Sequence, residues 1–219
     1  MDLNGVNMIT CGMDNCYVIR GAAGDILIDT GIPKYRDEIE TWLQNYNVKL
    51  IALTHGHNDH IGNAAYFSKL YGAEIAICAH DLKLSENNLL HKVYSVGVVG
   101  KAVWAASQKL MSEKAEPFEA GILLEDGMDI GGSLGINCKA VRLDGHTRGS
   151  FGFLCGDDLY AGDAAVNFVY PSFPVMCESP KAARASLEKI KSISPKRIFF
   201  GHGMPIESGT KEYRRMFIR

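Results

Sequence analysis

The chain has 219 residues, of which 47% are hydrophobic and 22% charged, and its formal net charge is −2. This length and balance predict one compact domain, residues 1–219, and exclude a disordered or fibrous protein. Because the charge is nearly balanced, we expect no nucleic-acid partner.

The N-terminus lacks a basic segment followed by a long apolar one, and no apolar run is long enough to cross a bilayer. We therefore expect a cytoplasmic protein without a membrane partner. Its cysteines are scattered and form no C-x-x-C pair, which favours reduced, buried thiols over a disulfide framework. They are Cys11, Cys16, Cys78, Cys138, Cys155 and Cys177.

Short β-rich runs alternate with a few helical patterns along the chain. The predicted strands are residues 6–11, 16–20, 25–29, 49–54, 74–78, 136–143, 151–155, 158–161 and 197–200. The predicted helices are residues 35–46, 61–71, parts of 80–111, and 181–193, the last with Ser179 as N-cap before Pro180. This order predicts an α+β fold of two mixed β-sheets packed face to face, with helices on the outer faces. Residues 80–118 interrupt it and predict a helical insertion over one rim, either a pocket lid or a plain packing element.

Candidate metal ligands follow several of the predicted strands. His55 comes after residues 49–54, His146 after 136–143 and His202 after 197–200. Two aspartates obey the same rule, since Asp29 ends residues 25–29 and Asp163 follows 158–161. If these strand ends share one edge, the side chains converge there. Gly56, Gly145, Gly162 and Gly201 neighbour these candidates and allow close backbone approach.

The stretch from His55 to His60 predicts ligands for two ions. In extended backbone, His55 and His57 point the same way and can share a first ion with His146. Asp59 occupies an N-cap position, so Asp59 and His60 turn toward a second ion, which His202 would also bind. Asp163 is suited to bridge the two ions because a carboxylate has two oxygens. His80 and His91 lie outside this pattern, where a surface or packing role is favoured.

These segments together resemble the metallo-β-lactamase superfamily, and most closely its hydroxyacylglutathione hydrolase-like branch. THGHNDH (54–60) is similar to the H-x-H-x-D-H signature of that superfamily. The other matching segments are DGHTRGS (144–150), YAGDA (160–164) and FGHG (200–203). The resemblance implies a four-layer αβ/βα sandwich with a dinuclear site at the sheet edge. It also implies that Asp29 orients the ligand loops from outside the metal site.

The chain departs from several branches of the superfamily. Arg148 stands where many relatives have proline, and its side chain faces either the pocket or solvent. Asp163 at the bridging position makes the true β-lactamases, which have Cys or His there, poorer matches and argues against antibiotic hydrolysis. His57 disfavours the di-iron flavoproteins, which have glutamate at this place. The lactone-hydrolysing branch has a tyrosine soon after its bridging aspartate, whereas residues 164–166 here are Ala-Ala-Val. Because only seventeen residues follow His202, we expect no C-terminal glutathione-binding domain like that of the usual hydroxyacylglutathione hydrolases.

From this site we expect a hydrolase in which two divalent ions share a water and lower its pKa toward neutrality. The bridging hydroxide would attack a small ester, thioester or lactone, and Asp59 would be catalytic as well as a ligand by orienting that hydroxide. Zinc is favoured for imidazole and carboxylate ligands, and iron or manganese also fit. The alternatives are a mononuclear-iron oxidoreductase resembling persulfide dioxygenases, and a phosphodiesterase acting on a small phosphate ester. A metal-binding relative without activity is disfavoured, because no ligand is missing.

The substrate pocket is less clearly marked in the sequence. Residues 167–174 combine aromatic residues with prolines and suit a semi-rigid loop over the metals, although core packing explains some of them equally well. Together with the insertion around Tyr94 to Trp104, this loop is expected to shape a largely apolar pocket for a small neutral or weakly charged acyl compound. The pattern singles out no substrate-binding residue and leaves the oligomeric state open.

Overall fold

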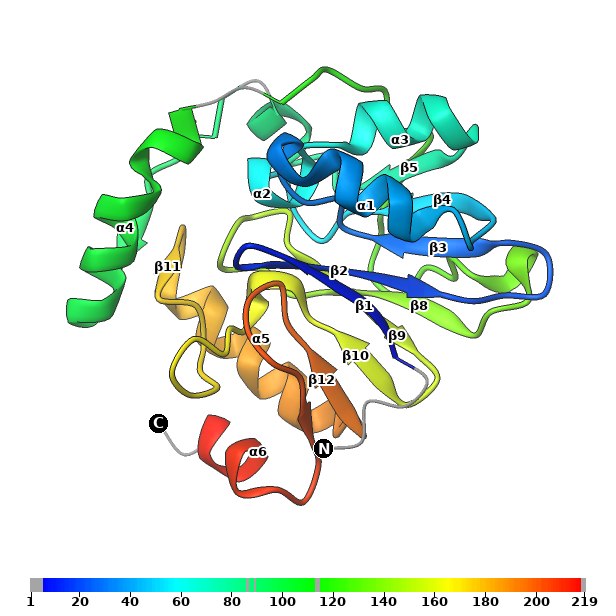
Figure 1. Cartoon of the computed structure of the whole chain (residues 1–219). Helices are drawn as coiled ribbons and strands as arrows, with labels where there is room; N and C mark the ends of the chain where they lie inside the picture. Colours follow the sequence, from blue (N-terminus) through cyan, green and yellow to red (C-terminus); the bar gives the residue numbers. More distant parts are fainter. Residues whose placement is uncertain (1–5, 86, 89, 113–114, 218–219) are drawn as a thin grey trace.

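The structure is a computed structural model that describes residues 6–85, 87–88, 90–112 and 115–217. Two β-sheets face each other, and helices cover their outer faces (Figure 1). The first sheet has the order β1-β2-β3-β4-β5-β7, and the second has the order β13-β12-β10-β9-β8. The predicted α+β sandwich of two mixed sheets is therefore confirmed.

The first sheet is antiparallel at one side and parallel at the other. Its strands are β1 (Asn7–Cys11), β2 (Asp14–Ile19), β3 (Asp25–Ile28), β4 (Val48–Ala52), β5 (Glu74–Ile77) and β7 (Ile122–Leu123). Strands β1, β2 and β3 pair antiparallel, whereas β3, β4, β5 and β7 pair parallel. The 3-10 helix η1 (Pro33–Tyr35) with α1 (Arg36–Leu43) and α2 (Asn58–Ile61) with α3 (Ala64–Tyr71) form the crossovers from β3 to β4 and from β4 to β5, as parallel pairing requires.

Strand β4 shows why this sheet needs cover on both faces. Successive side chains of a strand point to opposite faces. Leu50 and Ala52 therefore enter the core between the two sheets, while Ile51 packs under the helices with Ile39 of α1 and Phe67 of α3. Because all of these side chains are buried, the helical layer is part of the hydrophobic core.

The second sheet carries its own helical layer. Its strands are β8 (Cys138–Arg142), β9 (Phe151–Cys155), β10 (Asp158–Tyr160), β12 (Arg197–Phe199) and β13 (Ile206–Glu207). Helix α5 (Pro180–Ile193) begins where predicted, with the Ser179 hydroxyl accepting a hydrogen bond from the Ala182 N–H at 3.2 Å. Leu187 and Ile190 of α5 pack against this sheet, and α6 (Lys211–Met216) lies beside the same layer.

The insertion of residues 80–118 is only partly helical. It contains the 3-10 helix η2 (Leu82–Ser85), strand β6 (Tyr94–Ser95) and α4 (Gly97–Ser112). Strand β6 pairs antiparallel with β11 (Met176–Cys177), and α4 lies at one side of the molecule, near β6, β11 and α2 (Figure 1). The pairing of β6 with β11 has no local signal, because each strand is two residues long and its partner is distant in sequence. The remaining short elements are the 3-10 helices η3 (Gly132–Leu134) and η4 (Gly162–Ala164).

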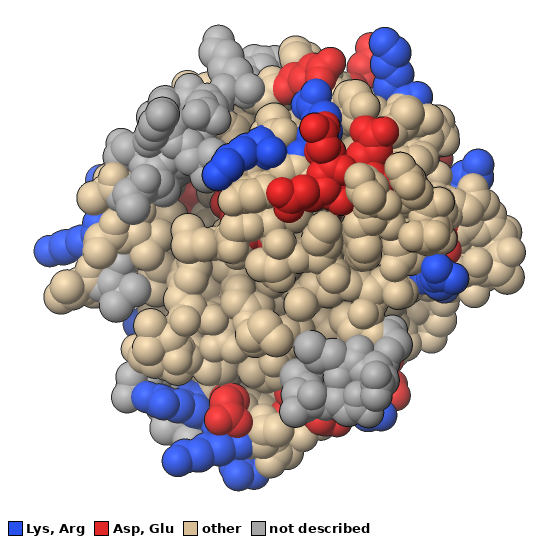
Figure 2. Space-filling model, viewed as in Figure 1, with Lys and Arg blue, Asp and Glu red and all other residues tan. Residues whose placement is uncertain are grey.

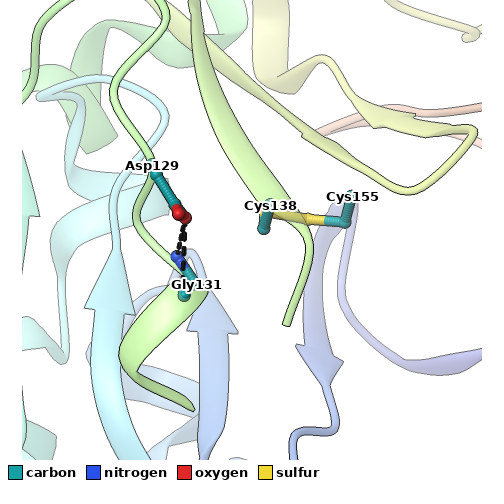
Figure 3. The surroundings of a disulfide bond; sticks show 5 residues. Asp129, Gly131, Cys138 and Cys155 are labelled. Carbon is teal, nitrogen blue, oxygen red and sulfur yellow. Dashed lines mark hydrogen bonds between the residues drawn. A yellow bond between two sulfur atoms is a disulfide. The ribbon is translucent and has the colours of Figure 1, made fainter. Parts of the chain in front are cut away.

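The expectation that all cysteines are reduced is wrong for two of them. Cys138 and Cys155 lie directly opposite each other in the β8–β9 ladder and form a disulfide, shown in Figure 3 beside the turn where the Gly131 N–H donates to Asp129. Their contact depends on the register of two strands, which a search for close cysteine spacing does not detect. Cys11, Cys16, Cys78 and Cys177 are free and buried, as expected.

None of the helices in the described part of the chain combines the length and the apolar composition that crossing a bilayer requires.

Phe153 provides a test of the core between the sheets. It lies on β9, is fully buried, and packs in the inter-sheet cluster. Phe153→Ala should lower the free energy of unfolding by about 3–5 kcal/mol, because it removes buried apolar surface and leaves a cavity. Urea denaturation measures this change. Val169→Ala, at a position 81% exposed, is the control and should change the same free energy by less than about 0.5 kcal/mol. Equal effects of the two substitutions would contradict the assigned core.

Candidate metal centre

The side chains predicted to bind metal lie together at one edge of the two sheets. They come from the loop after β4 and from α2 (His55, His57, Asp59 and His60), from the loop after β8 (His146), from η4 (Asp163) and from the loop after β12 (His202). All but Asp59 are buried, although titratable side chains are rarely buried without a partner. The structure thus brings every predicted ligand into one cluster, and the binding of metal by these residues stays a prediction.

The first group of this cluster consists of His55, His57 and His146, whose ring nitrogens lie within 4.8 Å of one another. The Nδ1 atom of His57 is 3.0 Å from Nε2 of His55 and 2.9 Å from Nε2 of His146. Burial and the neighbouring His146 lower the pKa of His57 to about 3, and burial holds the pKa of His55 well below its usual range. Histidine binds a cation through a neutral imidazole, and a metal site brings several imidazole nitrogens close to one point.

The second group consists of Asp59, His60 and His202, with the carboxylate of Asp163 beside it. Nε2 of His202 is 3.5 Å from Asp59 and 3.2 Å from Asp163, and Nε2 of His60 is 3.8 Å and 3.7 Å from the same two carboxylates. Asp163 also lies 3.6 Å from Nε2 of His146. A single carboxylate therefore reaches both groups, as the bridging position requires.

Two atoms at the centre of the cluster indicate that a cation fits there. Among the described residues, Nε2 of His60 and Oδ1 of Asp163 are buried and have no hydrogen-bond partner. An unpaired buried polar atom costs free energy, whereas a divalent ion would coordinate both of these atoms at once. Imidazole nitrogens together with carboxylate oxygens form a ligand set suited to zinc, iron or manganese.

The second group differs from the first in its charge. Burial disfavours the charged form of His60, but Asp29, Asp59 and Asp163 outweigh it and raise its pKa to about 10. In the same way Asp163 outweighs the burial of His202 and raises its pKa well above the usual range. The two histidines lower the pKa values of Asp59 and Asp163 in return, against the effect of burial. A cation that enters this group must therefore displace protons from His60 and His202.

Three of the histidines are held by a hydrogen bond from the ring nitrogen that faces away from the centre. The Nδ1 atom of His60 lies 2.8 Å from the carboxylate of Asp29. His146 and His202 place Nδ1 2.8 Å and 3.0 Å from the carbonyl oxygens of Met176 and Met13. Such contacts fix the ring orientation and leave Nε2 free to bind metal.

Asp29 makes the contacts that an orienting residue needs. Besides His60, its carboxylate accepts hydrogen bonds from the backbone N–H and the hydroxyl of Thr54, both at 2.8 Å. Its backbone has a φ of 55°, a left-handed conformation that is uncommon for a residue other than glycine. Asp29 thus ties the end of β3 to the loop that carries His55, while its functional role stays a prediction.

Asp81 and Asn88 position the ligand loops and are missing from the sequence prediction. The Oδ2 atom of Asp81 accepts hydrogen bonds from the Gly56 N–H at 3.0 Å and from the Thr147 hydroxyl at 2.7 Å, so it connects the loops of the first group. Asn88 accepts a hydrogen bond from the N–H of Asn58 at 2.7 Å. Asp81 lies shortly after β5, so the pattern in which candidate residues follow a strand would have identified it. Both residues belong to the insertion, which the sequence pattern marks only as a lid or packing element.

Asp14 is a further buried carboxylate that sequence reasoning missed. It begins β2, and its Oδ1 lies 3.3 Å from Nδ1 of His202. Burial and the nearby Asp59 raise the pKa of Asp14 to about 7, although His202 opposes the shift. The turn between β1 and β2 therefore contributes both Met13 and Asp14 to the surroundings of His202. No spacing in the sequence links this turn to a histidine so far along the chain.

His80, His91 and Arg148 lie outside the cluster. His80 is exposed, and His91 pairs with Glu178 at 2.6 Å. The side chain of Arg148 is 74% exposed, while its backbone N–H donates to Glu178. Among the described residues these three side chains do not line the cavity over the metal cluster.

A cavity of about 470 Å³ opens over the cluster. Its polar part is formed by Asp14, His57, Asp59, Asn88, His146, Asp163 and His202. The rest of its lining is mainly apolar and includes Val93 and Val103 of the insertion, Phe168 and Pro174 of the 167–174 loop, Val166 and Val175. Both segments expected to shape the pocket therefore contribute to it.

Comparison with known proteins identifies the family. The model of the metallo-β-lactamase superfamily matches residues 9–202, which include every predicted ligand. The chain belongs to the metallo-β-lactamase superfamily.

Individual relatives are distant. The beta-lactamase-like protein 2 homologs of Caenorhabditis elegans and Drosophila melanogaster are 24% and 29% identical over 88% and 91% of this chain. This chain covers 57% and 62% of their respective lengths, so it spans about three-fifths of these relatives. The metallo-beta-lactamase fold-containing protein ST1585 of Sulfurisphaera tokodaii is 26% identical, with coverage of 85% of this chain and 71% of that protein.

Two solved structures illustrate the similarity of fold. A metallo-beta-lactamase family protein of Thermus thermophilus, TTHA1429, superposes with a TM-score of 0.70 at 20% identity, over 97% of this chain and 77% of that one. The structure of TTHA1623 in a di-iron-bound form superposes with a TM-score of 0.65 at 24% identity, over 92% of this chain and 93% of that one.

Asp81 can be tested with a matched pair of substitutions. Asp81→Ala removes the acceptor shared by Gly56 and Thr147 and should weaken metal binding by about 10- to 100-fold, a loss typical of outer partners of a metal site. Asp81→Asn keeps one acceptor oxygen and should retain most of the affinity. Competition with a chromogenic chelator measures both. An alanine variant that binds metal as tightly as the unmodified protein would contradict this role.

Gly201 tests how closely the backbone approaches the second group. A Cβ atom at this position would lie 2.3 Å from Oδ1 of Asp163 and 2.7 Å from Cε1 of His60, so both side chains would have to move. Gly201→Ala should therefore lower the affinity for one ion by at least about tenfold. Gly121→Ala, whose Cβ would approach no atom closer than 3.4 Å, is the control. Metal titration followed by calorimetry compares the two, and equal affinities would refute the crowding.

Proposed function

We propose that this chain is a metal-dependent hydrolase that cleaves a small ester, thioester or lactone. The observation that carries the proposal is the pair of ligand groups, linked by Asp163, at the base of a cavity with apolar walls. Membership of the metallo-β-lactamase superfamily, whose members are mostly metal-dependent hydrolases, supports the same class. The names of the relatives describe them as metallo-hydrolases or beta-lactamase-like proteins and do not specify the substrate of this chain.

In the proposed site His55, His57 and His146 would hold one divalent ion, Asp59, His60 and His202 would hold a second, and Asp163 lies within reach of both groups. When bound, these ions supply hydroxide at neutral pH and stabilise negative charge on oxygen. Asp59 is the least buried of the ligands and lines the cavity, so its carboxylate is positioned to accept a hydrogen bond from the attacking water and to fix its direction. Water adds to the acyl carbon, the bond to the leaving oxygen or sulfur breaks, and a proton from the water passes to the leaving group.

Asp29, Asp81 and Asn88 complete this proposal by holding the ligand loops in place. Their hydrogen bonds keep the ligand nitrogens converged before substrate arrives, so no loop has to rearrange during the reaction. Zinc suits the ligand set, and the di-iron-bound form of TTHA1623 supports iron as the second candidate.

The charge of the cavity favours acyl over phosphoryl substrates. Among its described lining residues there is no lysine or arginine to bind a phosphate ester. The face of the molecule in Figure 2 shows basic and acidic side chains interspersed around large uncharged areas, which supports a small-molecule substrate rather than a nucleic acid. A single-iron oxidoreductase resembling persulfide dioxygenases would use much the same ligands, so elemental analysis of the bound metal separates this alternative from a dinuclear hydrolase. A cytoplasmic location and a single domain of residues 1–219 remain predictions.

His57→Ala tests the proposed function directly. It removes a ligand of the first group and should lower both the metal content and the rate of hydrolysis. Each loss should exceed the roughly 10- to 100-fold that is typical when a residue hydrogen-bonded to a metal ligand is removed. The measurements are elemental analysis of the purified protein and initial rates against ester, thioester, lactone and phosphodiester substrates, with zinc, iron or manganese added.

His80→Ala is the matched control, because this exposed histidine lies outside the cluster. It should retain both metal and activity. A metal-loaded protein that hydrolyses none of these substrates, or a His57→Ala variant that keeps its metal and its rate, would overturn the proposal.

A further inference from the structure

One wall of the cavity over the metal cluster is supplied by the insertion. Val93 precedes β6, and Val103 lies in α4. The insertion is attached to the segment around β11 through the β6–β11 pairing and through the Val96 N–H, which donates to the carbonyl of Val175 at 2.7 Å. Since Nδ1 of His146 bonds to the carbonyl of Met176, this apolar wall is fixed relative to a predicted metal ligand.

The other side of the cavity is covered by the segment that follows η4. The ring of Phe168 stacks on the imidazole of His202, with centroids 5.3 Å apart and an angle of 22° between the planes. Val166 and Pro174 line the same cavity and are buried. Val166 and Ser172 exchange two backbone hydrogen bonds of 3.0 Å, which close the loop between them. The cavity thus has apolar surface on both sides of the metal cluster.

The charges of the cavity are confined to its base. In the part of the chain that the structure describes, the charged lining residues are Asp14, Asp59, Asp163 and His202, and all four belong to the ligand cluster or contact it. A charged group on the substrate that faced the walls would lose its hydration without gaining a partner, at a considerable cost. The walls therefore select a substituent that is neutral and apolar.

We propose that the cavity binds a neutral aliphatic acyl chain longer than acetyl, so that the substrate is an ester or thioester of such a chain. This inference rests on the proposed function, since it names the substrate class of the same site. A volume of about 470 Å³ lies within the range of sites for drug-sized ligands, and an acetyl group would leave most of it unfilled. Apart from Phe168, the apolar lining residues that the structure describes have no ring larger than that of Pro174, and such walls suit a flexible chain better than a planar ring system.

Binding of unreactive alcohols tests this proposal without catalysis. The dissociation constants of 1-butanol, 1-hexanol and 1-octanol, measured by NMR titration of the metal-loaded protein, should fall by about fourfold for each added methylene. This factor corresponds to about 0.8 kcal/mol per buried methylene. Dissociation constants that do not change with chain length would overturn the proposal.

Two substitutions on the same helix provide the structural control. Val103→Ser places a hydroxyl in the wall of the cavity and should reduce the gain per methylene to about twofold or less. Val98→Ser alters a side chain that is 84% exposed and does not line this cavity, so it should leave the gain unchanged. Val175→Ser repeats the test from the neighbouring segment that is hydrogen-bonded to the insertion, should Val103→Ser fail to fold. An unchanged gain in the variants of both Val103 and Val175 would overturn the assignment of the wall.

Kinetics separates the failure of this inference from that of the proposed function. Hydrolysis of p-nitrophenyl acetate and p-nitrophenyl octanoate should give kcat/KM values that differ by at least tenfold in favour of the octanoate. Equal kcat/KM values would overturn the inference and leave the hydrolase function intact. Length-dependent alcohol binding without hydrolysis of any acyl compound would overturn the hydrolase function and support the apolar chain site alone.

Discussion

The burial of many titratable groups in one small volume is the constraint on which the rest of the structure depends. Five imidazoles share this volume with the carboxylates of Asp29, Asp59 and Asp163. Without a cation, protons alone must balance these charges, and they gather on His60 and His202, where the carboxylates are. In the first group, burial instead lowers the pKa values of His55 and His57. The two groups are thus unequal before any ion binds, which implies unequal affinities for metal.

The sandwich satisfies this constraint by bringing loops from both sheets to one edge. Two carboxylates then hold ligand loops in place. Asp29 fixes the loop after β4, and Asp81 links the two loops that carry the first group. Close packing leaves no space for a side chain at Gly201, because the atoms of Asp163 and His60 already occupy it. The backbone and the ligand side chains therefore pack so closely that one carbon atom added at Gly201 would displace a ligand.

The fold and the candidate ligands could be predicted from the sequence because each has a local signal. Apolar runs of strand length end at His55, His146 and His202, and helical patterns lie between them, so the sheet edge follows from the order of elements. The β6–β11 pairing and the Cys138–Cys155 disulfide have no such signal, because they depend on the register of segments that meet only in the folded chain. Asp14 was missed for the same reason, since its partner His202 lies near the other end of the sequence. Asp81 had a signal in the strand before it, but the irregular pattern of the insertion obscured it.

The insertion has two parts with different roles, and the boundary between them determines which part can be replaced without the other. Its later residues, from Val93 onward, contribute a wall of the cavity, whereas Asp81 and Asn88 at its start support the loops of the cluster. A graft intended to redesign specificity can therefore replace the segment beyond Asn88 and keep the contacts of Asp81 and Asn88, provided that the new segment restores the pairing with β11 beside the Met176 carbonyl that holds His146. A chimera joined before Asp81 would exchange the wall and dismantle that support together, so its loss of activity would say nothing about which molecules the new wall accepts.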